Sequence, residues 1–215
     1  DLLVQHGATS ILSETSEIYG AEHLLTRRAV TPEVGQALID RLDWWEEYCA
    51  RNGAKMDNNP SPGNKRGGLT TILEKSLGAV SKSGQAPLSG VFNYAAPLTA
   101  KGLVFMDSPG YDPCSVTGQV ASGATLIAFT TGRGSVSGYK PAPCIKLSSN
   151  SELFARMGED IDINCGDVAQ GVSLADKGAE IFEKLIAVAN GAPSKSEDLG
   201  FGGVEFVPWQ IGAVL

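Results

Sequence analysis

The sequence predicts a three-layer α/β fold, in which helices cover both faces of a mainly parallel, Rossmann-like sheet. The main observation is that residues 102–107, 125–131 and 143–147 are apolar runs without the polar alternation of a one-sided sheet. Strands of this kind are buried on both faces, and helical patterns between them are typical of parallel sheets. We expect residues 1–215 to form a single α/β domain, which at this length buries about 70% of its unfolded surface.

The N-terminal part is expected to contain a short strand and a long helix. Gly7 suits the left-handed residue after a helix end, and residues 8–13 form the first apolar strand. Thr31 supplies a hydroxyl cap for a helix that has Pro32 in its first turn and runs to about Asn52. Apolar residues recur along this helix at helical spacing, so one stripe of it is expected to be buried. The stripe consists of Val34, Leu38, Leu42, Trp45, Tyr48 and Cys49.

A central helix is expected after the glycine-rich turn at residues 63–68 and before Gly84. Apolar side chains recur in it at helical spacing, which indicates that this face is buried. The residues that follow, 85–97, are typical of a loop-rich stretch. The expected buried face consists of Leu69, Ile72, Leu73, Leu77 and Val80.

The C-terminal half continues the alternation of strands and helices. Pro113 is expected to start a short helix. Ser173 and Asp176 have the spacing of a capping box at the start of the last clear helix, which ends before Gly191. The tail, residues 197–215, is too apolar for a disordered terminus, so we expect it to pack against the rest of the protein.

The composition excludes several classes of partner. A formal net charge of −7 argues against nucleic acid and anionic membrane surfaces, and no apolar run approaches the ~20 residues of a membrane span. The four cysteines are scattered, so we expect reduced thiols in a cytoplasmic protein. The acidic segment 159–167 imitates a calcium loop, but its glycine is misplaced and the closing glutamate is missing, which excludes an EF-hand. Because the chain starts at Asp1, inside an expected structural unit, we interpret it as a piece of a longer protein.

Two glycine-rich turns, at residues 63–68 and 130–135, are the main candidates for ligand binding. Neither has the glycine spacing or the GK[ST] ending of a nucleotide-binding motif. Each instead combines backbone donors with cations, Lys65 and Arg66 in the first turn and Arg133 in the second, so we expect a carboxylate with neighbouring hydroxyls to bind there. The alternative for Arg133 is an ion pair with a structural carboxylate. The expected substrate-binding residues are Asn64, Gly67, Gly68, Thr130, Thr131 and Gly132.

Four carboxylates lie at or near the expected strand ends, where open α/β sheets place their ligands. Together with the cations, they indicate a polar site for a divalent hard metal and a polyhydroxy acid. A metal chelated by a sugar acid would acidify the proton next to the carboxylate, and a lysine or carboxylate would then remove it. The alternative for Glu14 and Glu17 is that they only begin the next helix near its positive end. The expected metal ligands are Glu14, Glu17, Asp107 and Asp112.

Six sequence blocks cover nearly the whole chain in order: HGATSILSETSEIYGAEHLLTRRA, NNPSPGNKRGGLTTILEKSLGAV, FMDSPGYDP, FTTGRGS, DIDINCG and EFVPWQIGAV. Together they resemble the altronate dehydratase family, which also includes galactarate dehydratase and the large subunit of sulfolactate sulfo-lyase. The resemblance implies dehydration of D-altronate to 2-dehydro-3-deoxy-D-gluconate in hexuronate breakdown, supported by Fe²⁺ or Mn²⁺. It also implies that this chain is the C-terminal catalytic region, with the N-terminal part of the same polypeptide as its partner. Assembly into a homo-oligomer is left open.

For this reaction the expected catalytic residues are Lys65, Lys75 and Arg133. Arg133 and the amides of the 63–68 turn would hold the substrate carboxylate, while Lys65 or Lys75 acts on the C2 proton or the enediolate. A metal or an acid would assist the C3 hydroxyl to leave. For Lys75 the alternative is a surface ion pair. The rival functions are galactarate dehydratase, sulfolactate sulfo-lyase, or a non-catalytic sugar-acid-binding or assembly module of a larger enzyme.

Overall fold

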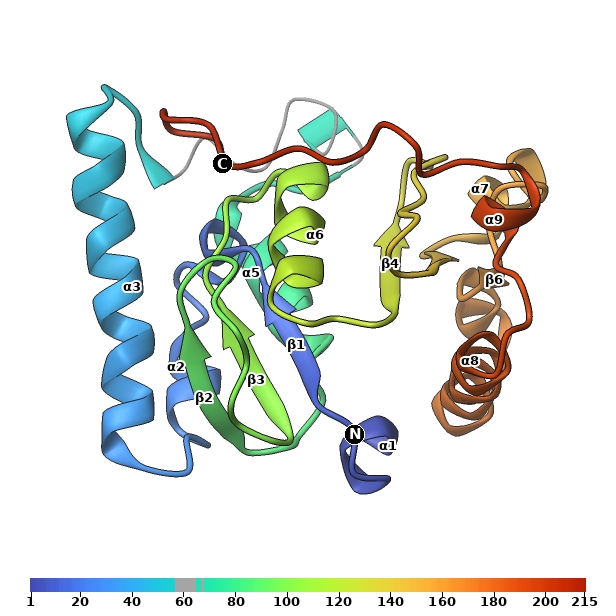
Figure 1. Ribbon diagram of the computed structural model, residues 1–215, viewed down its shortest axis with the longest axis horizontal. Helices are drawn as coiled ribbons and strands as arrows, with labels where there is room; N and C mark the ends of the chain where they lie inside the picture. Colours follow the sequence, from blue (N-terminus) through green and yellow to red (C-terminus); the bar gives the residue numbers. More distant parts are fainter. Residues whose placement is uncertain (57–64, 67) are drawn as a thin grey trace. The chain divides into compact units, whose positions relative to one another are not determined.

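The computed structural model describes residues 1–56, 65–66 and 68–215, and Figure 1 shows the path of the chain through its helices and strands. The chain divides into two compact units. The first consists of Asp1, Leu3–Gly123 and Val207–Leu215, and the second of Leu2 and Ala124–Phe206. Each unit contains a three-stranded sheet in which all strands are parallel, which confirms the predicted α/β class. The grouping of both units into a single domain stays a prediction.

The sheet of the first unit has the strand order β1-β3-β2, formed by Ser10–Ser13, Leu103–Met106 and Leu88–Phe92. Met106 is in register with both Ser13 and Phe92, so the three strands end together at one edge. Strands β1 and β3 are confirmed predictions, whereas β2 was missed because its sequence is typical of a loop. Pairing with β3 overrides that local preference. The helices that accompany this sheet are α1 (Leu2–Gln5), η1 (Thr15–Ile18), α2 (His23–Thr26), α3 (Pro32–Arg51), α5 (Ile72–Ser81) and α6 (Asp112–Ala121).

Helices α3 and α6 cover opposite faces of this sheet. Side chains alternate along a strand, so Phe105 and Met106 of β3 point to opposite faces. Phe105 lies in the hydrophobic core cluster together with residues of α3. The sulfur of Met106 instead accepts a hydrogen bond of 3.0 Å from the Ser122 hydroxyl at the end of α6. The predicted layering, with helices on both faces, is therefore present in this unit.

Helix α3 forms as its sequence predicts. The Thr31 hydroxyl accepts a hydrogen bond of 3.4 Å from the Val34 N–H, and Pro32 is the first helical residue. The stripe is buried at Leu38, Leu42, Trp45 and Cys49, and each such side chain contributes about 1.5–3 kcal/mol. Trp209 of the tail stacks on Trp45 with ring centroids 5.1 Å apart, so the last part of the tail, Val207–Leu215, packs on this unit as predicted, whereas residues 197–206 belong to the second unit.

The predicted buried face of α5 is partly wrong. Val80 is buried, but Leu73 and Leu77 are 53% and 51% exposed, and the buried side of the helix carries Ser76 and Ala79 instead. The reason is a hydrogen bond of 2.7 Å from the Ser76 hydroxyl to the Tyr19 carbonyl, which turns this small-residue side of α5 toward the chain after η1. Helical spacing alone does not distinguish the two sides.

The sheet of the second unit has the order β4-β5-β6, formed by Ile127–Thr131, Cys144–Ser148 and Ile163–Asn164. Ser148 is in register with both Thr131 and Asn164, so these strands also end together. The first two strands are confirmed predictions. None of the helices described in the structure combines the length and apolar character needed to cross a membrane. The helices of this unit are α7 (Ser151–Arg156), η3 (Gly166–Gln170), α8 (Leu174–Ala189) and α9 (Lys195–Asp198).

Asp162, in the acidic segment that imitates a calcium loop, is fully buried and ties this second unit together. One carboxylate oxygen accepts a hydrogen bond of 2.9 Å from the Lys146 N–H of β5. The other accepts one of 3.1 Å from the Lys195 N–H of α9 and lies 3.4 Å from the Lys184 ammonium of α8. Both oxygens therefore hold elements of the fold together.

Asp107 has the corresponding position in the first unit, directly after β3. Its buried Oδ1 accepts hydrogen bonds of 2.5 Å from the Thr15 hydroxyl and 2.7 Å from the Trp45 indole N–H. Its Oδ2 lies 3.9 Å from the Arg41 guanidinium. One carboxylate thus connects η1, α3 and the end of β3.

We expect Asp107→Ala to lower the free energy of unfolding by roughly 2–4 kcal/mol, because two buried donors lose their acceptor. Urea denaturation of the variant and the wild-type chain measures the difference. Asp40→Ala is the matched control, since Asp40 lies on the exposed side of α3 and accepts a hydrogen bond of 2.8 Å from the Gln36 side chain. Equal losses in the two variants would contradict the anchoring role.

Candidate functional site

The candidate site lies at the edge of the first sheet where β1 and β3 end. Glu14 follows β1 directly, and Asp112 is the first residue of α6 after the loop that leaves β3. Glu17 lies one turn along, in η1. Open α/β sheets place their ligands outside the carboxyl ends of their strands, so the parallel register brings these acidic side chains to the expected edge.

Glu14 has an unusual backbone conformation, with φ at 73° in the left-handed region. Residues other than glycine rarely adopt this conformation, and where they do the strain is held by the surrounding structure, often at a functional site. Its N–H donates a hydrogen bond of 3.0 Å to the Ser108 hydroxyl. The left-handed turn directs the chain out of β1 and into η1.

The acidic side chains influence one another. Burial raises the pKa of Glu14 well above its ordinary value, and the charges of Glu17 and Asp112 raise it further against a smaller opposing effect of Lys82. Burial also raises the pKa of Asp112, again with the charge of Glu17 and against Lys75 and Lys82. A carboxyl whose protonated form is favoured by burial and by neighbouring carboxyl groups is an arrangement used in acid–base catalysis.

Two lysines balance part of this negative charge: Lys75 of α5, and Lys82, which directly follows α5. The Lys75 ammonium lies 2.5 Å from Glu17 Oε1. Lys75, Lys82 and Glu17 also line a hollow of about 270 Å³ on this side of the unit, together with Gly78 and Ala79 of α5. Lys82 was missed from the sequence, although it follows Lys75 by two helical turns and so shares its face. Lys75 does form an ion pair, but not the surface pair given as its alternative: its partner is Glu17 of the site, and only 18% and 12% of the two side chains are exposed.

The four expected metal ligands do not all come together. Glu14, Glu17 and Asp112 are close enough for their charges to interact. Asp107 is turned into the core, where both of its oxygens have partners, and burial raises its pKa against those contacts. Among the residues that the structure describes, no group of three or more His, Cys, Asp or Glu side chains could hold a metal ion. The described residues therefore do not fit a ready metal centre, and Fe²⁺ or Mn²⁺ stays a prediction.

The first glycine-rich turn is described only in part. Asn64 and Gly67 lie outside the described residues. Lys65 and Arg66 are exposed, and Gly68 has φ at 108°, a conformation that favours glycine. The role of this turn in holding a carboxylate stays a prediction.

The second glycine-rich turn follows β4 in the second unit. The Thr131 hydroxyl accepts hydrogen bonds of 3.4 Å and 3.1 Å from the N–H groups of Arg133 and Gly134, so it shapes the turn. Thr130, Gly132 and Arg133 are exposed, and the Arg133 carbonyl accepts a hydrogen bond from Arg156. Because Lys65 and Arg133 belong to different units, their meeting at one rim stays a prediction.

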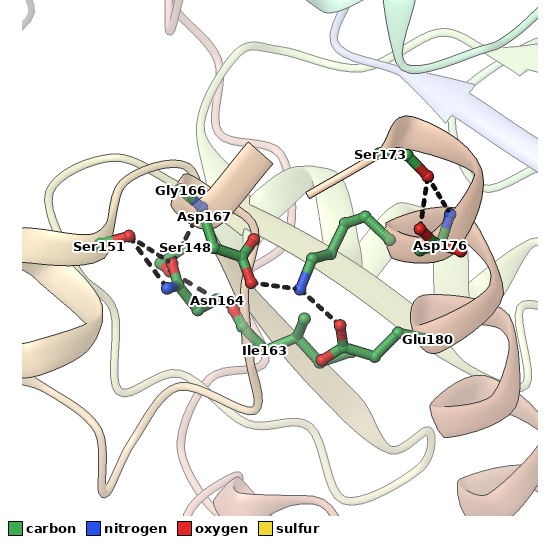
Figure 2. A network of polar contacts seen from close by, with 10 residues as sticks. Ser148, Ser151, Ile163, Asn164, Gly166, Asp167, Ser173, Asp176 and Glu180 are labelled. Atoms are coloured by element: carbon green, nitrogen blue, oxygen red, sulfur yellow. Dashed lines mark hydrogen bonds and ion pairs between the residues drawn. The ribbon is translucent and has the colours of Figure 1, made fainter. Parts of the chain in front are cut away.

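The corresponding edge of the second sheet carries a network of polar contacts (Figure 2). The Lys177 ammonium lies 2.9 Å from Asp167 Oδ2 and 2.5 Å from Glu180 Oε2. Burial lowers the pKa of Lys177, but the hydrogen bonds and charges of Glu180 and Asp167 outweigh burial and raise it. A lysine held in its charged form by two carboxylates is suited to a structural role and not to proton abstraction.

Asn164 and Gly166, in the block DIDINCG, lock the loops at this edge. The Asn164 side chain accepts a hydrogen bond of 2.9 Å from the Gly166 N–H and donates one of 3.0 Å to the Ser151 hydroxyl (Figure 2). A Cβ atom at position 166 would lie 2.1 Å from the Ser151 nitrogen, so only glycine fits. This block therefore serves the fold of the second unit.

Comparison with known proteins agrees with the resemblance seen in the sequence. The family model for D-galactarate/altronate dehydratase, C-terminal, matches residues 1–214. A galactarate dehydratase (L-threo-forming) of Escherichia coli (strain K12) is 40% identical over 199 residues, 92% of this chain and 38% of the relative. An altronate dehydratase of Bacillus subtilis (strain 168) is 36% identical over 170 residues, 79% of this chain and 34% of the relative. The beta subunit of a (2R)-sulfolactate sulfo-lyase of Chromohalobacter salexigens is 35% identical over 204 residues, 93% of this chain and 52% of the relative.

We expect Glu14→Gln to raise the free energy of unfolding at about pH 8 and to leave it unchanged at about pH 4. The pKa of Glu14 is higher in the folded chain than in the unfolded one, so its favourable contribution is present at low pH and is lost as the pH rises through the folded pKa. The amide reproduces the donor of the protonated carboxyl but cannot ionise. Urea denaturation at both pH values measures the effect.

Glu47→Gln is the control for this comparison, because Glu47 lies on α3 with its side chain exposed to solvent. The difference between Glu14→Gln and wild type should grow with pH, whereas that for Glu47→Gln should not. If Glu14→Gln is less stable than wild type at the higher pH, the result would contradict the electrostatics of the site.

Proposed function

Because this chain belongs to the D-galactarate/altronate dehydratase family, we propose that the full-length protein is a hydro-lyase that removes water from an acyclic sugar acid. The chain spans about half or less of the length of these relatives, so the activity is assigned to the whole protein. The observation that carries the proposal is the cluster of Glu14, Glu17 and Asp112 beside two lysines at the ligand-binding edge of a parallel sheet.

The proposed reaction is a β-elimination in which this cluster supplies both acid and base. Glu17 or Asp112 acts as the base that removes the proton from C2 of the substrate, and Glu14, whose raised pKa favours the protonated form, donates its own proton to the hydroxyl that leaves C3. The C2–H and C3–O bonds break, the C2=C3 bond forms and water departs. The resulting enol then tautomerises to a 2-keto-3-deoxy acid.

The lysines have an electrostatic role in this proposal. Lys75 and Lys82 bring positive charge to the hollow, where it stabilises the enediolate that develops as C2 loses its proton. The substrate carboxylate is held by Lys65, by the backbone amides of the 63–68 turn and by Arg133 in this proposal. No step is routed through a metal ion.

Two substrates are proposed for this reaction. D-altronate follows from the sequence blocks, and galactarate is supported by the 40% identity to a galactarate dehydratase, against 36% to an altronate dehydratase. A second class of function, a sugar-acid-binding or assembly module without chemistry of its own, is supported by the short span of the chain within its relatives. Calorimetric binding of either sugar acid to this chain without turnover by the chain, together with full-length turnover that Glu14→Gln leaves unchanged, would favour that module.

We expect Glu14→Gln in the full-length protein to lower kcat for the preferred substrate by roughly 10²–10⁴, the usual contribution of a general acid. Turnover is measured with D-altronate, galactarate and sulfolactate as a panel. Glu47→Gln, on the exposed side of α3, is the matched control. Wild-type turnover of Glu14→Gln on every substrate that the protein accepts would refute the proposed site.

The metal expectation has its own test. If Fe²⁺ or Mn²⁺ supports the reaction, dialysis of the full-length protein against a chelator will abolish turnover, and either ion will restore it while Mg²⁺ will not. Circular dichroism before and after dialysis shows whether the fold has changed. Full activity after complete removal of metal would leave the protein's own acid and base as the whole mechanism.

A further inference from the structure

We propose that Ser108 is a positioning residue, whose buried hydroxyl holds the strained backbone of Glu14 and so aims the Glu14 carboxyl at the substrate. This inference rests on the proposed function. Ser108 lies in the loop after β3, is fully buried and does not line the hollow that contains Lys75. Its contacts, and not its chemistry, connect it to the site.

Ser108 holds Glu14 and Thr15, the two residues of the turn that leaves β1. The Ser108 hydroxyl accepts the hydrogen bond of 3.0 Å from the Glu14 N–H. The Ser108 carbonyl accepts one of 2.9 Å from the Thr15 N–H, and the Ser108 N–H donates one of 3.3 Å to the Thr15 hydroxyl. A non-glycine residue with positive φ persists only where the surroundings fix it, and these bonds fix it.

The Ser108 hydroxyl also contacts helix α6. The Ser108 hydroxyl lies 3.0 Å from the Ser115 hydroxyl and 3.1 Å from the Pro109 carbonyl, which compete for its one proton, while the Ser115 oxygen also lies 3.0 Å from the Ser13 hydroxyl. Gln119 donates hydrogen bonds to both Ser13 and Ser115. Four buried or half-buried polar side chains therefore join the end of β1, the loop after β3 and helix α6.

This network fixes two acidic side chains of the site relative to each other. Ser13 precedes Glu14, and Ser115 follows Asp112 by one turn of α6. A buried polar network with satisfied members holds its partners in one arrangement, whereas apolar packing would allow small shifts. Shifts of about 1 Å at reacting groups can cost roughly a hundredfold in rate, so the network affects catalysis without touching the substrate.

Ser108→Ala in the full-length protein tests the inference. We expect kcat to fall by roughly tenfold or more with KM nearly unchanged, because a misplaced acid weakens the transition state and not substrate binding. Ser122→Ala is the matched control, since this buried serine directly follows α6 and its hydroxyl donates a hydrogen bond to the Met106 sulfur. It should leave kcat and KM at their wild-type values. Ser108→Cys, which keeps a weak donor and acceptor, should recover part of the lost kcat.

Repeating Ser108→Ala in a Glu14→Gln background distinguishes a role through Glu14 from a purely structural role. If Ser108 acts through Glu14, the second substitution adds no further loss of kcat, because coupled residues are non-additive. Equal losses in both backgrounds, or wild-type kcat in the single variant, would overturn the inference. Wild-type turnover of Glu14→Gln alone would instead refute the proposed site, and this inference with it.

Discussion

The parallel pairing of β1 with β3 is the constraint on which the site depends. It ends both strands at one edge, so Glu14 and Asp107 leave the sheet side by side. They then take opposite directions. Asp107 turns inward and binds the side chains of Thr15 and Trp45, while the left-handed turn at Glu14 carries its side chain toward the acidic cluster. The hydrogen bonds of Asp107 hold the end of β3 and η1 in place, and this fixed surrounding allows the strained conformation of Glu14 to persist.

The acidic side chains at the two edges differ in their surroundings. In the second unit Asp167 and Glu180 share the ammonium of Lys177. In the first unit burial raises the pKa of Glu14, and the charges of Glu17 and Asp112 raise it further. A buried carboxyl beside other carboxylates costs stability, which is typical of residues retained for chemistry.

Family membership and the geometry support each other at this point. The family model for D-galactarate/altronate dehydratase, C-terminal, matches the chain, and a dehydration requires a proton donor and a proton acceptor within reach of adjacent carbons. In the first unit the charges of Glu14, Glu17 and Asp112 interact, and Glu17 lines a hollow together with Lys75 and Lys82. The serine network beneath them gives this small cluster the rigidity that proton transfer needs.

The sequence by itself determined the α/β class, four of the strands, the Thr31 cap and the grouping of Glu14, Glu17 and Asp112, because hydrophobic period, capping and strand ends are local patterns. Only the tertiary structure decided that Asp107 is an anchor, that α5 buries Ser76 and not Leu77, and that Ser108 supports Glu14. Glu14 and Ser108 are 94 residues apart in the chain. A hydrogen bond across that separation leaves no periodic trace in the sequence, since it exists only once the two strands have paired.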